Sequence, residues 1–335
     1  MIDYRDNYNF IIASGTNEFY RYVYQDVNKL DYAYFENGIP VSKILRLLMK
    51  AHFSNKTNRI FSLPLKSVWG KVWVAHWKKI LKREMNAENK KMCFILFADL
   101  ISLEDYGLSR LIRKSFPDCR IVYFYQDLVR HDPNKLKLIE RKIPDFIISF
   151  DPRDAEKYGL KYHNVPYSKL RNEFPSSQLE SDICFIGRAK DRLNQIVDAY
   201  IFFSSQGLKC DFYITDVPEE ARVHSDKIHY CEPMSYDTYL NIMVKSKCIL
   251  EIMQKGGAGN TLRTNEAVEF NKILITNNES LVKNALYDER YMFVYKDIHQ
   301  LDCKKIEQLD EVRYNNRELM SVEGFLEDIA RELQC

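Results

Sequence analysis

The stretch from Cys248 to Asn277 constrains the fold more than any other part of the chain, because it joins two apolar segments through a loop and a helix. We expect strands at 248–252 and 272–276. Before the polar start of the helix lie three glycines, Gly256, Gly257 and Gly259. Glycines let a loop approach a ligand closely, and the first amides of the next helix can bind an anion such as phosphate. The same pattern also fits a tight turn that binds no ligand.

Three side chains near the start of this helix suit a nucleotide. Thr261 can cap the helix or bond a phosphate oxygen, and Arg263 can pair with a phosphate through two hydrogen bonds. Glu266 can accept hydrogen bonds from a ribose diol. Each role is common in proteins, so the hypothesis of a phosphate site depends on their combination.

The 335-residue chain is long enough for two domains of about 150 residues each, and its 46% hydrophobic and 29% charged positions are typical of a globular protein. It has no apolar run of about 18 residues, and Asp3, Arg5 and Asp6 interrupt its start, so we expect neither a membrane span nor a cleaved secretion signal. The eight cysteines lie far apart, with no Cys-x-x-Cys pair. This spacing predicts reduced core cysteines in a cytoplasmic protein.

Residues 41–90 form a strongly basic segment, with twelve Lys or Arg and two acids. It contains all three tryptophans at helical spacing, Trp69, Trp73 and Trp77. A cationic flank accompanies them, formed by Lys71, Lys78, Lys79, Lys82 and Arg83. Such a helix can lie on an anionic membrane surface, or its tryptophans can be core and its lysines a solvated face. No nucleic-acid recognition motif accompanies the basic residues, so we expect no nucleic-acid partner.

The first half of the chain alternates between expected strands and helices. Buried strands are expected at 9–13, 93–98, 120–125 and 146–150. Three of them stop at a carboxylate, namely Asp99, Asp127 and Asp151. Because the carboxyl ends of parallel strands face the ligand crevice, these side chains are expected to line a cleft, although Asp is also a common helix N-cap. The pattern predicts a doubly wound α/β domain.

A second α/β series begins after the polar segment 168–181, which we interpret as a linker. Strands are expected at 182–186 and 210–215, and helices at 191–206 and 236–244. An amphipathic helix with Ser321 as its cap ends the chain. The sequence thus predicts an N-terminal domain at 1–170, a C-terminal domain at 171–318 and a C-terminal helix at 319–335.

Four segments of the second half occur in a recognisable order, at 185–190, 236–250, 257–267 and 271–276. In this order they resemble the donor domain of group 1 glycosyltransferases of the GT-B fold, in particular bacterial enzymes that assemble capsule and lipopolysaccharide sugars. The resemblance covers the last half of the chain well and the first half in outline. It implies an α/β fold of two Rossmann-like doubly wound domains facing a central cleft. Many members carry a first glutamate where this chain has Ala258, and Gln254 or loop amides are the candidates to replace it.

The resemblance implies a nucleotide-diphosphate sugar as donor substrate, with UDP as the expected nucleotide and no cofactor. The charge that develops on the departing diphosphate must then be met by helix amides and by cations, for which Arg188, Lys190 and Arg263 are available. The chain contains no Asp-x-Asp motif, so we expect a metal-independent reaction. The expected donor site comprises Gly187, Arg188, Lys190, Gln254, Gly257, Gly259, Asn260, Thr261, Arg263 and Glu266.

The N-terminal domain is expected to bind a saccharide or lipid-linked saccharide acceptor. An inverting reaction needs a general base there, for which Asp127 is the first choice, followed by His131 and Asp99. A retaining reaction needs no such base. A lipid-linked acceptor implies a cytoplasmic protein that lies peripherally on the inner face of the plasma membrane, through the basic tryptophan segment. Two other classes stay open: a GT-B-fold nucleotide-sugar epimerase and a non-catalytic nucleotide-sugar-binding protein.

Overall fold

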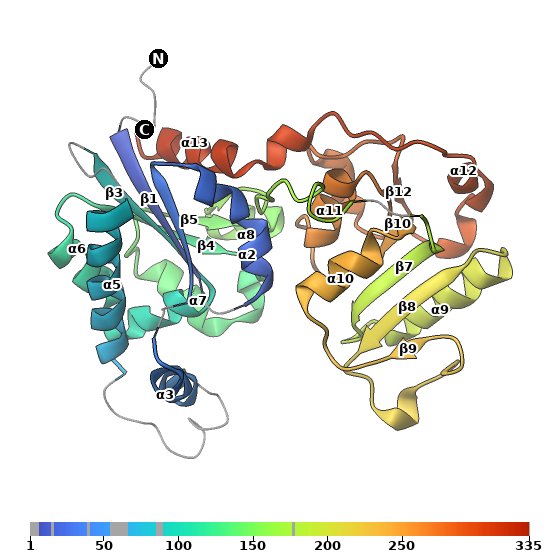
Figure 1. Cartoon of the computed structure of the whole chain (residues 1–335), viewed down its shortest axis with the longest axis horizontal. Helices are drawn as coiled ribbons and strands as arrows, with labels where there is room; N and C mark the ends of the chain where they lie inside the picture. The colour runs from blue at the N-terminus through green and yellow to red at the C-terminus, as the bar shows by residue number, and fades with distance from the viewer. Residues whose placement is uncertain are drawn as a thin grey trace. The chain divides into compact units, whose positions relative to one another are not determined.

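The computed structural model describes residues 7–14, 17–38, 41–53, 66–84, 90–175 and 178–334. The chain divides into two compact units: the first contains Met1–Phe150, Asp154–His163 and Phe325–Cys335, and the second contains Asp151–Arg153 and Asn164–Gly324. Each unit is built on one six-stranded sheet with helices packed on it (Figure 1). The predicted α/β fold with two doubly wound sheets is confirmed. The domain limits expected at 170 and 318 stay predictions.

The sheet of the first unit is parallel, with the strand order β2-β1-β3-β4-β5-β6. Its strands are β1 (Tyr8–Ser14), β2 (Ala33–Asn37), β3 (Lys91–Phe97), β4 (Arg120–Tyr125), β5 (Phe146–Ser149) and β6 (Lys161–Tyr162). The four strands expected in this half are confirmed as β1, β3, β4 and β5. All four are largely buried, as the continuous apolar runs of a covered parallel sheet require.

Helices cover both faces of this sheet. On one face, α5 (Val68–Glu84) and α6 (Leu108–Ser115) pack against residues such as Phe94 and Leu96 (Figure 1). On the other face, the Tyr20 ring of α2 (Phe19–Val23) lies 5.0 Å from Phe97. The other α-helices described in this part of the chain are α3 (Lys43–Phe53), α7 (Pro133–Glu140) and α8 (Pro152–Tyr158).

The three tryptophans of α5 belong to the core of the first unit. Trp69, Trp73 and Trp77 are 4%, 3% and 0% exposed. The Trp77 ring lies 5.3 Å from that of Trp73 and 5.2 Å from that of Phe94. Because these rings are buried against the sheet, they are not available to a membrane, which corrects that part of the membrane hypothesis. The cationic flank is exposed along the same helix, at Lys71, Lys78, Lys79, Lys82 and Arg83.

The sheet of the second unit is also parallel, with the order β12-β11-β10-β7-β8-β9. Its strands are β7 (Ser181–Arg188), β8 (Cys210–Thr215), β9 (His229–Tyr230), β10 (Ser246–Glu251), β11 (Ile273–Thr276) and β12 (Met292–Val294). From β7 the chain winds through β8 and β9 in one direction and through β10 to β12 in the other. This reversal is a topological switch point, and ligands of such folds bind outside the carboxyl ends of the two strands beside it.

Helices again lie on both faces of the second sheet (Figure 1). One face packs against α9 (Leu193–Ser205) and α12 (Cys303–Glu307). The other face carries α10 (Tyr236–Met243) and α11 (Leu262–Phe270). The last helix is α13 (Val322–Glu332), and the predicted cap at Ser321 is confirmed because its Oγ accepts a hydrogen bond of 3.1 Å from the Gly324 amide. None of the helices described is long and apolar enough to cross a membrane.

Candidate functional site

The glycine-rich loop lies at the switch point, between the carboxyl end of β10 and the start of α11. Gly256 has a φ of 86°, and the Gly257 amide donates to the Gln254 carbonyl at 3.0 Å, which closes a turn after the strand. Thr261 is the helix N-cap, and its side chain accepts a hydrogen bond of 3.1 Å from the Arg263 amide. Thr261 therefore has the capping role, one of the two roles expected for it.

Glu251, the last residue of β10, holds the base of the loop together. Its buried carboxylate accepts hydrogen bonds from the hydroxyl groups of Thr261, Thr264 and Thr276. It thereby joins the strand end, the helix start and β11. Glu251 was not among the predicted site residues, although a carboxylate at the end of an apolar strand was the signal that identified Asp127.

Asp151 belongs to the second unit and lies against the glycine loop. Its Oδ2 accepts hydrogen bonds from the amides of Ala258 at 2.8 Å and Gly259 at 3.1 Å. The residue is fully buried, so it does not line an open cleft as the sequence pattern suggested. Two amides of the glycine loop, which were candidates to replace the first glutamate of the family, therefore have a carboxylate as their partner.

Arg263 extends from the first turn of α11 to the carboxyl end of β7. Its Nη2 donates to the Ile186 carbonyl, and its guanidinium lies over the Phe185 ring at 5.3 Å from the ring centroid. A methyl group on Gly187 would lie 2.5 Å from Nη2, so Arg263 would have to move if residue 187 carried a side chain. Gly187 and Arg263, both expected in the donor site, are thus adjacent in the structure.

Arg192 is a second cation at this point, and it was not among the predicted site residues. Its guanidinium donates to the carbonyls of Ile252 and Arg188, which joins the ends of β10 and β7. The side chain is 7% exposed, and burial, followed by the nearby positive charge of Arg263, lowers the pKa of Arg192 to about 10. Two cations that repel each other at a switch point favour an anionic ligand. The position of Arg192 in the loop before α9, close to Arg188, was the signal in the sequence that could have identified it.

The remaining two cations of the predicted set are more exposed. Arg188 is the last residue of β7, and its Nε lies 3.2 Å from a carboxylate oxygen of Asp216. Lys190 is exposed and has a φ of 47°, in the left-handed region. Arg188 thus ends β7 and Lys190 lies two residues beyond it, both at the carboxyl end of the strand that Arg263 also reaches.

Glu266 is directed at two tyrosines of α10. It accepts hydrogen bonds from Tyr236 Oη at 2.6 Å and from Tyr239 Oη, and the rings of these tyrosines stack with centroids 5.4 Å apart. Burial raises the pKa of Glu266, while the hydrogen bonds from both tyrosines act in the opposite direction. The carboxylate expected to bind ribose is thus 1% exposed and already has two hydroxyl partners.

Two amide side chains complete the predicted donor set. Gln254 is exposed after the strand end. Asn260 is 2% exposed, and no described residue accepts a hydrogen bond from its Nδ2. A buried amide donor without an acceptor is unusual, so Asn260 is the clearest candidate in the loop for a hydrogen bond to a ligand.

In the first unit, Asp127 lies in a pocket of about 140 Å³ at the carboxyl end of β4. Its carboxylate is 88% exposed and lies 4.0 Å from Lys135 Nζ. Tyr125 also lines this pocket, and its buried hydroxyl has no hydrogen-bond partner among the described residues. The carboxylates of Asp105, Asp127 and Asp132, the Lys135 ammonium and the Tyr125 phenol thus lie around one small cavity.

The other two candidate bases lie elsewhere. His131 is exposed in the short 3₁₀ helix Val129–His131 and does not line this pocket. Asp99 follows β3, and its side chain lies outside the described part of the structure. Within the described ranges, no group of three or more His, Cys, Asp or Glu side chains is arranged to hold a metal ion.

Known proteins resemble the chain in structure but not in sequence. No protein-family model matches it, and a search of curated protein sequences finds no significant match. The glycosyltransferase AviGT4, involved in avilamycin A biosynthesis, has 9% identity and a TM-score of 0.52, with 97% of each chain covered. An alpha-glucosyltransferase in complex with UDP and mismatched DNA has 14% identity and a TM-score of 0.53, covering 97% of this chain and 94% of that chain.

This chain has the GT-B fold. A second alpha-glucosyltransferase structure, with UDP-glucose and DNA containing an abasic site, agrees at 13% identity and a TM-score of 0.51, with 97% of this chain and 93% of that chain covered. Within this GT-B chain, the residues gathered at the switch point belong to the second unit: Gly187, Arg192, Arg263 and the loop 256–260.

Proposed function

We propose that this GT-B protein is a metal-independent glycosyltransferase that uses a nucleotide-diphosphate sugar. The observation that carries the proposal is the pair of guanidinium groups of Arg192 and Arg263 beside the glycine loop at the switch point of the second sheet. A departing nucleoside diphosphate accumulates negative charge, which positioned guanidinium groups and helix amides stabilise. The proposed donor is UDP-linked, as in the UDP and UDP-glucose complexes of the structurally similar alpha-glucosyltransferase.

On the donor side, the proposed roles follow from position. Arg263, Arg188 and Lys190 bind the diphosphate, together with the amides at the start of α11, and the buried Arg192 adds positive charge beside them. Asn260 Nδ2 donates a hydrogen bond to the nucleotide sugar, and Gln254 contacts the sugar ring. Glu266 receives the ribose hydroxyls once Tyr236 and Tyr239 share its oxygens with the ligand.

On the acceptor side, we propose that the pocket around Asp127 binds a sugar hydroxyl. The exposed carboxylate can accept the hydroxyl proton, which an inverting reaction requires, while Tyr125 Oη can hydrogen-bond a second hydroxyl group. Lys135 Nζ lies 4.0 Å from this carboxylate and can hydrogen-bond a further hydroxyl group of the acceptor. The proposed acceptor is a saccharide or lipid-linked saccharide of bacterial capsule or lipopolysaccharide synthesis.

A lipid-linked acceptor requires access to a membrane, and α3 offers a surface that the buried tryptophans do not. Ile44 and Leu47 are 78% and 67% exposed, and Leu48 lies on the same helical face. On another side of α3, Trp69 Nε1 donates to His52 Nδ1 at 2.6 Å, which attaches the helix to α5. The sequence of α3 contains three basic residues and no acid. We propose that α3 rests on an anionic membrane surface, assisted by the cationic flank of α5.

A donor panel tests the proposed activity. The full chain is incubated with nucleotide sugars that differ in base and sugar, with and without bacterial lipid extract as acceptor source, and products are identified by mass spectrometry. A transferase releases nucleoside diphosphate in a reaction that persists in a metal chelator and is lost in Arg263→Ala. Conversion of the sugar to its epimer without release identifies an epimerase. Binding without turnover identifies a non-catalytic protein.

A further inference from the structure

The second unit contains a pocket at the amino ends of its strands, whereas the glycine loop lies at their carboxyl ends. The volume of the pocket is about 590 Å³, within the range of small-molecule sites. Among its lining residues, Lys272 directly precedes β11 and Val244 lies just before β10, so the pocket lies at the amino ends of these parallel strands. The glycine loop follows the carboxyl end of β10. The two sites are therefore separate.

The lining of this pocket is cationic. It contains four basic side chains, Arg171, Lys272, Arg313 and Arg317, against one acid, Glu311. Glu311 is engaged with Arg313 at 2.7 Å, and both are largely exposed, at 70% and 76%. The acid therefore offsets one cation, and the other three have no acidic partner in the lining of this pocket.

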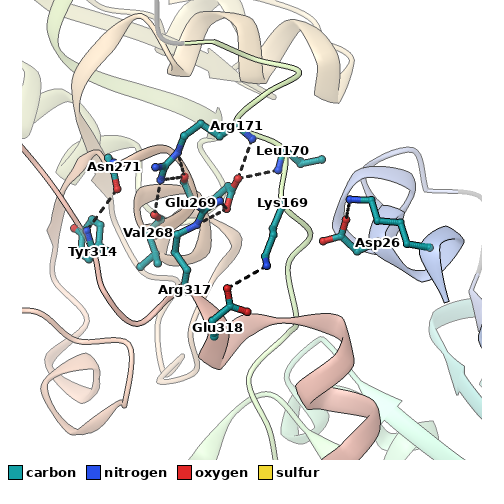
Figure 2. Close-up of polar contacts among 11 residues, drawn as sticks. Asp26, Lys169, Leu170, Arg171, Val268, Glu269, Asn271, Tyr314, Arg317 and Glu318 are labelled. Atoms are coloured by element: carbon teal, nitrogen blue, oxygen red, sulfur yellow. Dashed lines mark hydrogen bonds and ion pairs between the residues drawn. The ribbon is translucent and has the colours of Figure 1, made fainter. Parts of the chain in front are cut away.

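Two of these three cations contact the buried residue Glu269, Arg317 through its carboxylate and Arg171 through its backbone carbonyl (Figure 2). Glu269 Oε2 accepts hydrogen bonds from Arg317 Nε at 3.0 Å and Nη2 at 2.5 Å. Arg171 Nε donates to the backbone carbonyl of Glu269 at 2.8 Å, at the end of α11. Burial, followed by the positive charge of Arg317, lowers the pKa of Arg171. One negative charge thus faces two guanidinium groups, and the pair retains a net positive charge.

The remaining wall combines a buried ammonium with aromatic rings. Lys272 is 4% exposed and donates to the Val244 carbonyl at 2.5 Å. Phe174, Phe270 and Tyr314 also line the pocket, and Tyr314 Oη donates to the Lys272 carbonyl at 3.0 Å. A ligand with a compact anionic group and an apolar or ring-shaped part matches this lining.

We propose that this pocket binds a phosphate-bearing small molecule, with the phosphate on Arg313, Arg317 and Arg171. Arginine is suited to phosphate because its planar fork donates two parallel hydrogen bonds. The proposal goes beyond the transferase activity and does not depend on it. It adds a second anion site to the unit, at the other end of α11 from the glycine loop.

Isothermal titration calorimetry with inorganic pyrophosphate tests the pocket. The full chain carrying Arg263→Ala serves as host, because that substitution weakens any phosphate site at the glycine loop. Adding Arg313→Glu is expected to weaken pyrophosphate binding about tenfold or more, the effect of losing one charge-assisted hydrogen bond. Adding Lys304→Glu is the matched control, since Lys304 is exposed in the same unit and outside the pocket, and binding should change less than about twofold.

Two results overturn the proposal. Either the host binds no pyrophosphate at millimolar concentration, or Arg313→Glu and Lys304→Glu weaken it equally. Arg313→Gln, which removes the charge without reversing it, gives a milder second variant if Arg313→Glu fails to fold by circular dichroism. If the wild-type chain binds no nucleotide while Arg313→Glu still weakens pyrophosphate binding, the proposed transferase is rejected and the proposal for this pocket is supported.

Discussion

The carboxylate of Asp151 accepts a hydrogen bond of 3.1 Å from the amide of Gly259, in the loop before the helix start that is proposed to bind a diphosphate. A carboxylate and a diphosphate are both anions, so the two repel each other when the diphosphate is bound at the start of α11. Asp151→Asn keeps an oxygen acceptor but removes the charge. We expect it to increase the affinity for UDP about fivefold, roughly 1 kcal/mol, because repulsion between like charges is removed.

Calorimetric titration with UDP measures this effect, and Asp310→Asn is the matched control because Asp310 is exposed in the same unit. Weaker UDP binding by Asp151→Asn would show that the carboxylate supports the loop instead of repelling the ligand.

Arg263→Ala is expected to weaken UDP binding by about 1.5 to 3 kcal/mol, since it removes a charge-assisted hydrogen bond to the diphosphate. Arg263→Lys should recover only part of this loss, because an ammonium lacks the planar fork. Lys304→Ala controls for the change in net charge. Unchanged calorimetric affinity in Arg263→Ala would reject the assignment.

Glu266→Ala is expected to weaken binding of the ribose without affecting binding of the diphosphate. UDP binding should fall while inorganic pyrophosphate binding stays the same, because only UDP carries the ribose. The free energy of unfolding should also fall by about 2 to 4 kcal/mol, since the half-buried Tyr239 loses its acceptor and the Tyr236 hydroxyl keeps only Tyr167 as a partner. If both ligands bind more weakly to the same extent, Glu266 shapes the loop and does not contact the ribose.

Lys272 should make stability depend on pH in the alkaline range. Burial lowers its pKa from 10.5 to about 8, so below pH 8 both folded and unfolded chains carry the proton and the cost of burying the charge is fully present. Between pH 8 and 10.5 the unfolded chain binds more protons, so this contribution raises the free energy of unfolding with pH, by at most about 3 kcal/mol.

Urea unfolding of the wild type and Lys272→Met across this pH range measures the contribution. The stability advantage of Lys272→Met is expected to shrink as the pH rises above about 8. Parallel curves for the two proteins would mean that Lys272 titrates normally.

Membrane attachment is expected to depend on α3. The full chain should sediment with vesicles that contain phosphatidylglycerol at low salt, and Ile44→Ser with Leu47→Ser should abolish this. Val282→Ser with Leu319→Ser is the matched control, because both residues are exposed apolar side chains outside α3. Reversal of Lys78, Lys79, Lys82 and Arg83 to glutamate should weaken attachment, since each base near the surface contributes about 1 kcal/mol. Attachment that survives the α3 double substitution excludes this helix.

The strands that the sequence predicted are those whose burial is continuous. In β3, β4 and β10 nearly every residue is covered, so their apolar runs are visible without knowledge of their neighbours. The edge strand β2 carries Glu36 and Asn37, and β12 is three residues long, so neither shows such a run. These strands form because a neighbouring strand offers unpaired backbone groups.

In the candidate site, too, the features set by neighbouring residues could be predicted, whereas the contacts between distant residues could not. The glycine loop and the Thr261 cap follow from neighbouring residues. The partners of that loop do not: Asp151 is 107 positions from Ala258, and Arg192 is 60 positions from Ile252. Helical spacing likewise identified an apolar stripe at Trp69, but it could not say whether the stripe faces a core or a membrane.

The helix α13 begins at Val322 in the second unit, and from Phe325 onward its residues belong to the first. The Phe325 ring lies 5.3 Å from Phe124 and 4.9 Å from His163, and it is 1% exposed. On the ribosome, every strand of the first sheet emerges before this ring does. Translation therefore completes the core of the first unit only after the second unit has been made, and co-translational folding of this chain does not proceed one finished domain at a time.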